Sequence, residues 1–265
     1  MVIERFAAVR GLRLAWLDGG PEGGTPILAL HGHFGRARCF APLAAALAPG
    51  HRVIALEQRG HGHSDRGDGY GPDAYVADAA EFLRGLGLGP VIVLGHSMGG
   101  VVAFRLAARH PELVRALVVE EGGAYNRPPE IPHPVLDVRG WPRRSATLGE
   151  LRRDIEARGI PDAGYFLESA VEHADGWGLL FDHDDMVASQ RALVGDWWAD
   201  WLGSTCPALL VHGLDSFVLP TAMAGEMAAR RPGTVLRELA GCGHWAHDDD
   251  PAAFTRAVRD FLATL

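Results

Sequence analysis

The sequence predicts an α/β fold, in which a mostly parallel central sheet is flanked by helices and carries an inserted helical cap. Short continuous apolar runs, typical of strands buried on both faces, alternate with segments of helical periodicity up to residue 123 and again after residue 202. Residues 124–202 show helical patterns but no such runs. We therefore expect a core of residues 1–123 and 203–265 and a cap of residues 124–202.

The elements of the core follow from local periodicity. Alternation of Leu12, Leu14 and Trp16 with polar residues predicts an N-terminal antiparallel strand at residues 9–18. Continuous apolar runs predict buried strands at residues 27–30, 53–56, 90–94, 116–119 and 208–211, and a last strand is predicted at 234–239. Helical spacing predicts helices at residues 40–47, 73–86, 101–109, 223–230 and 251–262, the last of which begins at Pro251.

The cap begins with a proline-rich crossing, after which we expect three helices without strands between them. Thr147 and Glu150 form the capping-box start of the first helix. Pro161 opens the second helix, and the third covers residues 184–194. The tryptophans that follow, at positions 197, 198 and 201, are expected to pack where the cap rejoins the core.

A G-x-S-x-G turn, Gly95 to Gly99, follows one buried strand and opens a helix. This layout is typical of a nucleophile elbow, in which a serine lies on a strained strand-to-helix turn and side chains at the flanking positions would clash. His31, Glu57 and Glu120 also follow predicted strands directly. Because ligands bind at the carboxyl ends of parallel strands, we expect these side chains to share one edge with Ser97.

These motifs resemble those of α/β-hydrolase-fold enzymes, and the resemblance covers about residues 12–265. They occur in the family's order: His31-Gly32, the Gly-rich loop at 59–64, G-x-S-x-G, and Gly243-His244 near the end. The resemblance implies that Ser97 is the nucleophile and His244 its base. It also places the oxyanion donors on the backbone N–H groups of His33 and Met98.

Three carboxylates remain candidates for the acid behind His244. Many relatives carry the acid three residues after Gly213, but that position holds a serine and Asp215 lies one residue early. Another branch of the family carries it at the end of the strand after the elbow, which favours Glu121. Because adjacent strand residues point to opposite faces, Glu120 and Glu121 cannot both address His244. Glu121 is therefore the first choice, Asp215 the second and Glu120 the third.

Composition excludes several classes of function. The formal net charge of −8 argues against a nucleic-acid or anionic-membrane partner, and no apolar run approaches the length of a membrane span. The N-terminus lacks the plan of a signal peptide. Three widely spaced cysteines, at positions 39, 206 and 242, predict reduced buried thiols in a cytoplasmic protein.

Two groups of residues resemble metal ligands but lack a recognisable ligand spacing. His244-x-x-His247 is followed by three aspartates, and residues 182–185 read Asp-His-Asp-Asp. Acidic residues favour the first turn of a helix, so we interpret both groups as solvated helix starts and expect neither a metal nor a cofactor.

The sequence therefore predicts a cofactor-free serine hydrolase with a Ser–His–acid triad that cleaves a small, largely apolar ester, lactone or related acyl compound. Serine at the elbow argues against the dehalogenase and epoxide-hydrolase branches, which use aspartate there. Two alternatives stay open on the same fold: a carbon–carbon bond hydrolase of the meta-cleavage type, and a small-molecule receptor with slow turnover.

Overall fold

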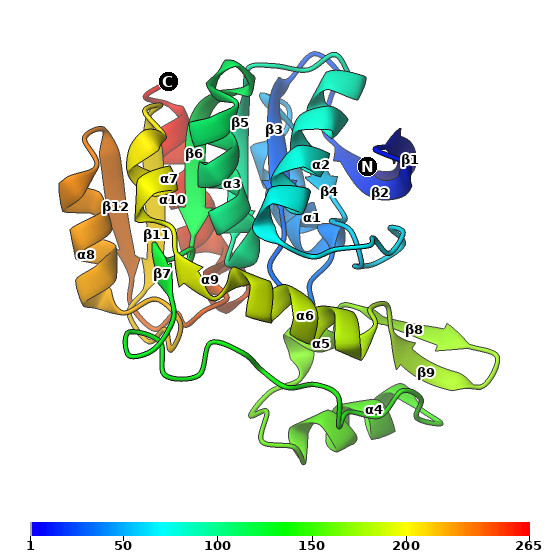
Figure 1. Cartoon of the computed structure of the whole chain (residues 1–265). Helices are drawn as coiled ribbons and strands as arrows, with labels where there is room; N and C mark the ends of the chain where they lie inside the picture. Colours follow the sequence, from blue (N-terminus) through cyan, green and yellow to red (C-terminus); the bar gives the residue numbers. More distant parts are fainter. Residues whose placement is uncertain (1) are drawn as a thin grey trace.

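The computed structural model describes residues 2–265, and its centre is an eight-stranded sheet of order β1-β2-β4-β3-β5-β6-β11-β12 (Figure 1). Strands from β4 to β12 along this order pair in parallel, whereas β1 with β2 and β2 with β4 are antiparallel. The strands of the sheet are β1 (Val2–Val9), β2 (Leu12–Gly19), β3 (Thr25–Leu30), β4 (His51–Leu56), β5 (Val91–His96), β6 (Val114–Glu120), β11 (Ala208–Gly213) and β12 (Thr234–Leu239). The predicted α/β architecture is confirmed.

Helices cover both faces of the sheet (Figure 1). One apolar cluster joins the sheet to α2, α3, α7 and α8, and a second joins the opposite face to α1, α9 and α10. The helices of the two layers are α1 (Ala41–Leu47), α2 (Pro72–Gly85), α3 (Met98–Arg109), α7 (Trp198–Gly203), α8 (Thr221–Arg230), α9 (Ala246–Asp249) and α10 (Pro251–Leu262), with short 3₁₀ turns at Ala37–Phe40 and Pro111–Leu113. Because both faces are covered, the central strands are mostly apolar and buried, as the continuous runs predicted.

The prediction at the N-terminus is incomplete. The expected antiparallel strand is present as β2, but it is the second arm of a hairpin whose first arm is β1. Arg10 and Gly11, both at positive φ, form the turn between them. Strand β1 lies at the edge of the sheet and is mostly exposed. Its sequence therefore lacks the alternation of apolar and polar residues by which a half-buried strand is predicted.

Residues 124–202 lie mainly beyond the carboxyl ends of the parallel strands (Figure 1). The elements of this segment before α7 are β7 (Tyr125–Asn126), α4 (Leu148–Glu156), α5 (Gly164–Leu167), β8 (Ala170–His173), β9 (Gly176–Leu179), α6 (His183–Leu193) and β10 (Gly195–Asp196). The capping box is confirmed, because the Glu150 N–H donates to the Thr147 hydroxyl. Trp201 packs on Phe104 of α3 with ring centroids 5.6 Å apart, so this end of the segment rejoins the core as expected.

The expectation of three helices without intervening strands is wrong. The antiparallel pair β8–β9 stands between α5 and α6, joined by a two-residue loop that ends at Gly176 with φ +122°. A side chain at Gly176 would clash, since a Cβ there would lie 2.5 Å from the carbonyl oxygen of Ser145. The second helix is a single turn that begins three residues after Pro161.

None of the helices in residues 2–265 is both long and apolar enough to cross a membrane. The three cysteines form no disulfide; Cys39 and Cys242 are buried and Cys206 is partly exposed, so the expectation of buried thiols holds for two of them.

Candidate active site

Ser97 lies at the sharp turn between β5 and α3, with φ 53° and ψ −117°. The flanking glycines are required by their surroundings. A Cβ atom at Gly95 would lie 2.1 Å from the carbonyl oxygen of Gly99, and one at Gly99 would lie 2.1 Å from that of Leu30. Neither position has room for a side chain, so the turn that the motif predicts depends on both glycines.

The side chains of Ser97 and His244 are in hydrogen-bond contact. Nε2 of His244 lies 3.0 Å from the Ser97 hydroxyl, and Nδ1 of the same ring lies 3.4 Å from Oε2 of Glu121. The second distance is longer than a typical hydrogen bond, which is common in catalytic sites without substrate. The order of the groups is that of a hydroxyl, a base that can accept its proton, and an acid that orients the base.

Glu121 follows β6 at φ 55°, and its carboxylate is buried. One oxygen accepts the Gly213 N–H at 2.8 Å and faces Nδ1 of His212 at 2.9 Å, while the other accepts the hydroxyl of Ser216. Burial alone would raise the pKa of Glu121, but hydrogen bonds from His212, His244 and Ser216 outweigh burial and lower the pKa below its ordinary value. Glu121 is therefore an anion at neutral pH.

Of the three carboxylates considered from the sequence, Glu121 is the one that the structure brings to His244. Asp215 is exposed, and among the described residues it makes no hydrogen bond to His244; its backbone N–H donates to the Cys242 carbonyl instead. Glu120 turns to the opposite side of the strand, as the alternation of side chains in β-strands requires.

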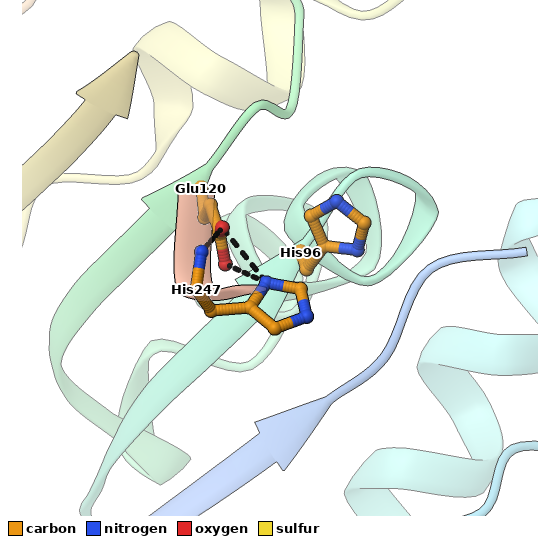
Figure 2. Close-up of side chains that lie close together, drawn as sticks. All are labelled: His96, Glu120 and His247. Carbon is orange, nitrogen blue, oxygen red and sulfur yellow. Dashed lines mark hydrogen bonds and ion pairs between the residues drawn. The ribbon is translucent and has the colours of Figure 1, made fainter. Parts of the chain in front are cut away.

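Glu120 binds His247 (Figure 2). Its Oε1 accepts the backbone N–H of His247 at 2.9 Å, and Nδ1 of that ring lies 2.8 and 3.0 Å from the two carboxylate oxygens. Both side chains are buried. The interpretation of His247 as part of a solvated helix start is therefore wrong: it does lie in α9, but its ring is turned inward, with its centroid 5.8 Å from that of Phe40.

His96, Glu120 and His247 bring potential metal-ligand atoms within 4.8 Å of one another. One nitrogen of each ring is engaged in a protein contact, because Nε2 of His96 donates to the His244 carbonyl at 2.8 Å and Nδ1 of His247 is paired with Glu120. The other two ring nitrogens, Nδ1 of His96 and Nε2 of His247, are buried and have no hydrogen-bond partner among the described residues. Figure 2 shows the His96 ring beside this pair rather than bonded to it. The other acidic group considered from the sequence is a helix start, as expected, since the Asp182 side chain caps α6.

We expect Glu120→Gln to destabilise the fold by about 3–5 kcal/mol, because it removes one charge of a buried pair. Burial lowers the pKa of His247, but the Glu120 carboxylate outweighs burial, so the pKa lies well above its ordinary value. A group with a raised folded-state pKa contributes stability that is fully present below its unfolded-state pKa, about 6.5 for histidine, and lost as the pH rises through the folded-state pKa. Urea unfolding should therefore give a larger difference between wild type and variant at pH 6 than at pH 9. Equal differences at the two pH values would contradict a charged pair.

The loop after β3 is held by the ring of His31. The Gln58 N–H donates to its Nε2 at 3.0 Å, so the proton lies on Nδ1, which donates to the Gly32 carbonyl at 2.8 Å. Burial lowers the pKa of His31 to about 4, which keeps the ring neutral and in this tautomer. The loop lies directly against the elbow, since a Cβ atom at Gly32 would be 3.1 Å from that of Ser97.

The two N–H groups predicted as oxyanion donors have no acceptor in the described part of the chain. The His33 N–H donates to no backbone or side-chain oxygen of residues 2–265. Met98 is the first residue of α3, where a helix leaves its N–H groups unsatisfied. Both groups are therefore available to a ligand beside Ser97.

A cavity of about 590 Å³ opens above Ser97, between the edge of the sheet and residues 124–202. Its walls are mainly apolar, with Phe34, Leu136, Ile160 and Phe166 among them. No arginine of the described residues lines it, and the sequence contains no lysine.

The histidines His33 and His96 also line the cavity, and both are neutral. Burial lowers the pKa of His33 to about 3 and that of His96 well below its ordinary value. The remaining histidines of the lining are His133 and the base His244, so no permanently charged cation of the described residues faces a ligand in the cavity.

Sequence analysis misses several residues that build the site. His212 and Ser216 hold the Glu121 carboxylate, and His96 holds the backbone of His244. From the sequence, Ser216 is only the residue at the position where many relatives carry the acid. A signal for each histidine was present: His212 lies at the end of a predicted strand, and His96 is the second residue of the G-x-S-x-G turn. Neither position is marked by its neighbours as different from an ordinary buried histidine, so only the three-dimensional contacts identify their roles.

Known proteins resemble this chain in sequence and in fold. The 2-(acetamidomethylene)succinate hydrolase of Mesorhizobium japonicum is 29% identical over 253 residues, which cover 90% of this chain and 88% of the relative. A crystal structure of E-2-(acetamidomethylene)succinate hydrolase matches with a TM-score of 0.90 at 24% identity, covering 99% of this chain and 100% of that one. That of an alpha/beta hydrolase from Novosphingobium aromaticivorans matches with a TM-score of 0.81 at 28% identity, covering 100% and 99%. A model of the alpha/beta hydrolase family matches residues 27–257, and the chain therefore belongs to that family.

Proposed function

We propose that this hydrolase is a cofactor-free serine hydrolase that cleaves a small, neutral, largely apolar ester or lactone through an acyl-enzyme on Ser97. The observation that carries the proposal is the contact of 3.0 Å between the Ser97 hydroxyl and Nε2 of His244, with the anionic Glu121 behind the ring. The mainly apolar cavity above Ser97 supports the substrate class.

In the proposed reaction His244 takes the Ser97 proton as the serine oxygen attacks the substrate carbonyl. The N–H groups of His33 and Met98 hold the negative charge that develops on the carbonyl oxygen. His244 then gives its proton to the leaving alcohol, and the acyl-enzyme is hydrolysed by a water molecule that His244 deprotonates. Glu121 keeps the proton of the neutral ring on Nδ1 and stabilises the charged ring.

We propose that residues 124–202 act as a cap that determines which substrates enter. The walls of the cavity support this role, because Leu136, Ile160, Phe166 and Leu193 come from this segment whereas Ser97 and His244 come from the sheet edge. The boundary at residue 202 falls within α7, which packs on α3.

Turnover of matched substrates tests the reaction class. We expect p-nitrophenyl esters of short apolar acids to be hydrolysed and vinylogous 1,5-diketones, the substrates of meta-cleavage hydrolases, to be left intact. Cleavage of the diketone at a higher kcat/KM than any ester would overturn the proposal in favour of carbon–carbon bond hydrolysis.

Substrate charge gives a second test. We expect p-nitrophenyl butanoate to be preferred about 100-fold or more in kcat/KM over the p-nitrophenyl monoester of succinate, which carries a free carboxylate. The reason is that the cavity offers no arginine or lysine and that leaving a charged group unpaired costs more than the 1–3 kcal/mol of a neutral one. This preference would distinguish the protein from its relative, whose named substrate contains succinate, a dicarboxylate. Equal kcat/KM values would contradict a site for neutral substrates.

A further inference from the structure

The ring of His33 is the end of a hydrogen-bonded chain that begins in the core of the fold. Its Nε2 lies 2.9 Å from the hydroxyl of Ser189 on α6, and that hydroxyl lies 2.8 Å from the phenol of Tyr75 on α2. Tyr75 and Ser189 are buried, and Ser189 is the phenol's hydrogen-bond partner among the described residues. Because a buried O–H group that donates to nothing is unfavourable, the Tyr75 hydroxyl donates to Ser189.

The direction of the next bond follows from the acceptors that Ser189 can reach. Its own proton can go to Nε2 of His33 or to the sulfur of Met98, which lies 3.8 Å away. A thioether is a weak acceptor and an imidazole nitrogen a strong one, so Ser189 donates to His33. A neutral imidazole that accepts at Nε2 carries its proton on Nδ1.

The Nδ1 atom of His33 is directed at no protein group. It makes no hydrogen bond within residues 2–265 and, unlike Nε2 of the nearby His61, it is not sealed from solvent. His33 lines the cavity above Ser97. The ring therefore presents a hydrogen-bond donor of fixed tautomer to the cavity, in addition to the backbone N–H of the same residue.

Gln190, another polar residue of the cavity wall, has both ends of its side-chain amide hydrogen-bonded within the protein. The amide oxygen of Gln190 accepts the Leu136 N–H at 2.8 Å, and its nitrogen donates to the carbonyls of Leu136 and Met186. The side-chain amide of Gln190 is thus not available to a ligand, whereas the Nδ1–H group of His33 is.

We propose that His33 is a specificity-determining residue, whose Nδ1–H donates to a hydrogen-bond acceptor on the substrate other than the carbonyl that Ser97 attacks. This inference rests on the proposed function and narrows it: the substrate is a neutral ester or lactone that carries a second oxygen acceptor, such as a ketone, on its acyl part. Selection works because a bound substrate without that acceptor displaces water from the N–H and leaves it unpaired.

Two esters with a ketone in the acyl chain and one ester without it test whether His33 selects substrates that carry a second acceptor. We expect wild-type protein to prefer p-nitrophenyl 4-oxohexanoate or 5-oxohexanoate over p-nitrophenyl hexanoate by about three- to tenfold in kcat/KM, the worth of one neutral hydrogen bond, after division by the uncatalysed rate of each ester. His33→Phe should abolish the preference, whereas His33→Asn, whose side-chain amide can donate near the position of Nδ1, should keep part of it. The backbone N–H is the same in all three proteins.

The matched control is Asn126→Leu, which removes another polar group of the cavity wall and should leave the preference unchanged. If His33→Phe slowed all three esters equally, the ring would have only a structural or oxyanion role and the inference would be overturned. Loss of the preference in Asn126→Leu would overturn it as well.

The tautomer of His33 is measurable without any substrate. We expect the ¹⁵N–¹H correlation spectrum of the histidine rings to show His33 protonated on Nδ1, with the signal assigned from its absence in His33→Asn. A proton on Nε2 would overturn the inference whether or not the esters are turned over. Failure to hydrolyse any ester would instead count against the proposed function, so the two failures are distinguishable.

Discussion

Replacing Ser97 by alanine is expected to lower kcat by about 10⁴–10⁶-fold while KM changes little, because the variant keeps the cavity and loses the group that forms the acyl-enzyme. The residual rate would come from binding and from the N–H groups of His33 and Met98, which the substitution leaves in place. The measurement is kcat and KM for p-nitrophenyl butanoate at neutral pH.

The fold is expected to survive this change. Alanine is smaller than serine and meets the same restriction at φ 53°, so circular dichroism and the urea midpoint should match those of wild type. A folded Ser97→Ala protein with a rate within tenfold of wild type would refute the acyl-enzyme mechanism.

Glu121→Gln is expected to lower kcat by up to about 10⁴-fold, because the surrounding hydrogen bonds fix how the glutamine amide is oriented toward His244. The Gly213 N–H donates to Oε1, so the amide oxygen of glutamine must occupy that position. The amide NH₂ then takes the position of Oε2 and faces Nδ1 of His244. A donor there forces the His244 proton onto Nε2, where the ring can no longer accept the proton of Ser97.

Two substitutions provide the comparison for Glu121→Gln. Asp215→Asn changes an exposed carboxylate that makes no hydrogen bond or ion pair with His244 in the described structure, so kcat should stay within about tenfold of wild type. Glu120→Gln should act mainly on stability, through the buried pair with His247. If Asp215→Asn caused the largest loss of kcat, Glu121 would not be the acid of the triad.

Much of the fold follows from the sequence because burial on both sides of the sheet leaves a strong pattern. Strands such as β5 and β6 are buried and mostly apolar, and the helix α3 between them buries a run of apolar residues. The elements that the sequence analysis misses lack this constraint. Strand β1 is exposed. The β8–β9 hairpin lies outside the main sheet, and only residues such as Leu179 at its end join an apolar cluster, so its short strands carry no continuous apolar run.

The same contrast applies to the site. Ser97 and His244 could be named because glycines at fixed positions mark each of them, and the crowding at Gly95 and Gly99 shows why those glycines are needed. Because side chains alternate between the two faces of a strand, the sequence indicates that Glu120 and Glu121 point in opposite directions. It does not indicate which of the two faces His244. The answer depends on contacts between distant segments, such as those of Glu121 with Ser216 and with Gly213, which no local pattern records.

The inward position of His247 has a similar origin. Its neighbours at positions 248–250 are acidic and favour a solvated helix start, yet the ring pairs with Glu120 from a strand more than a hundred residues earlier. A single buried ion pair leaves no periodicity in the sequence, so it could not be predicted.

Labelling with a fluorophosphonate tests most directly whether Ser97 is an activated nucleophile. The probe phosphonylates a serine whose hydroxyl is deprotonated by a neighbouring base, so intact-mass spectrometry should show one phosphonyl group per chain, and peptide mapping should place it on Ser97. Ser97→Ala and, to a large extent, Glu121→Gln should remain unlabelled under the same conditions. A wild-type protein that stays unmodified, or that carries the label on another residue, would contradict the account.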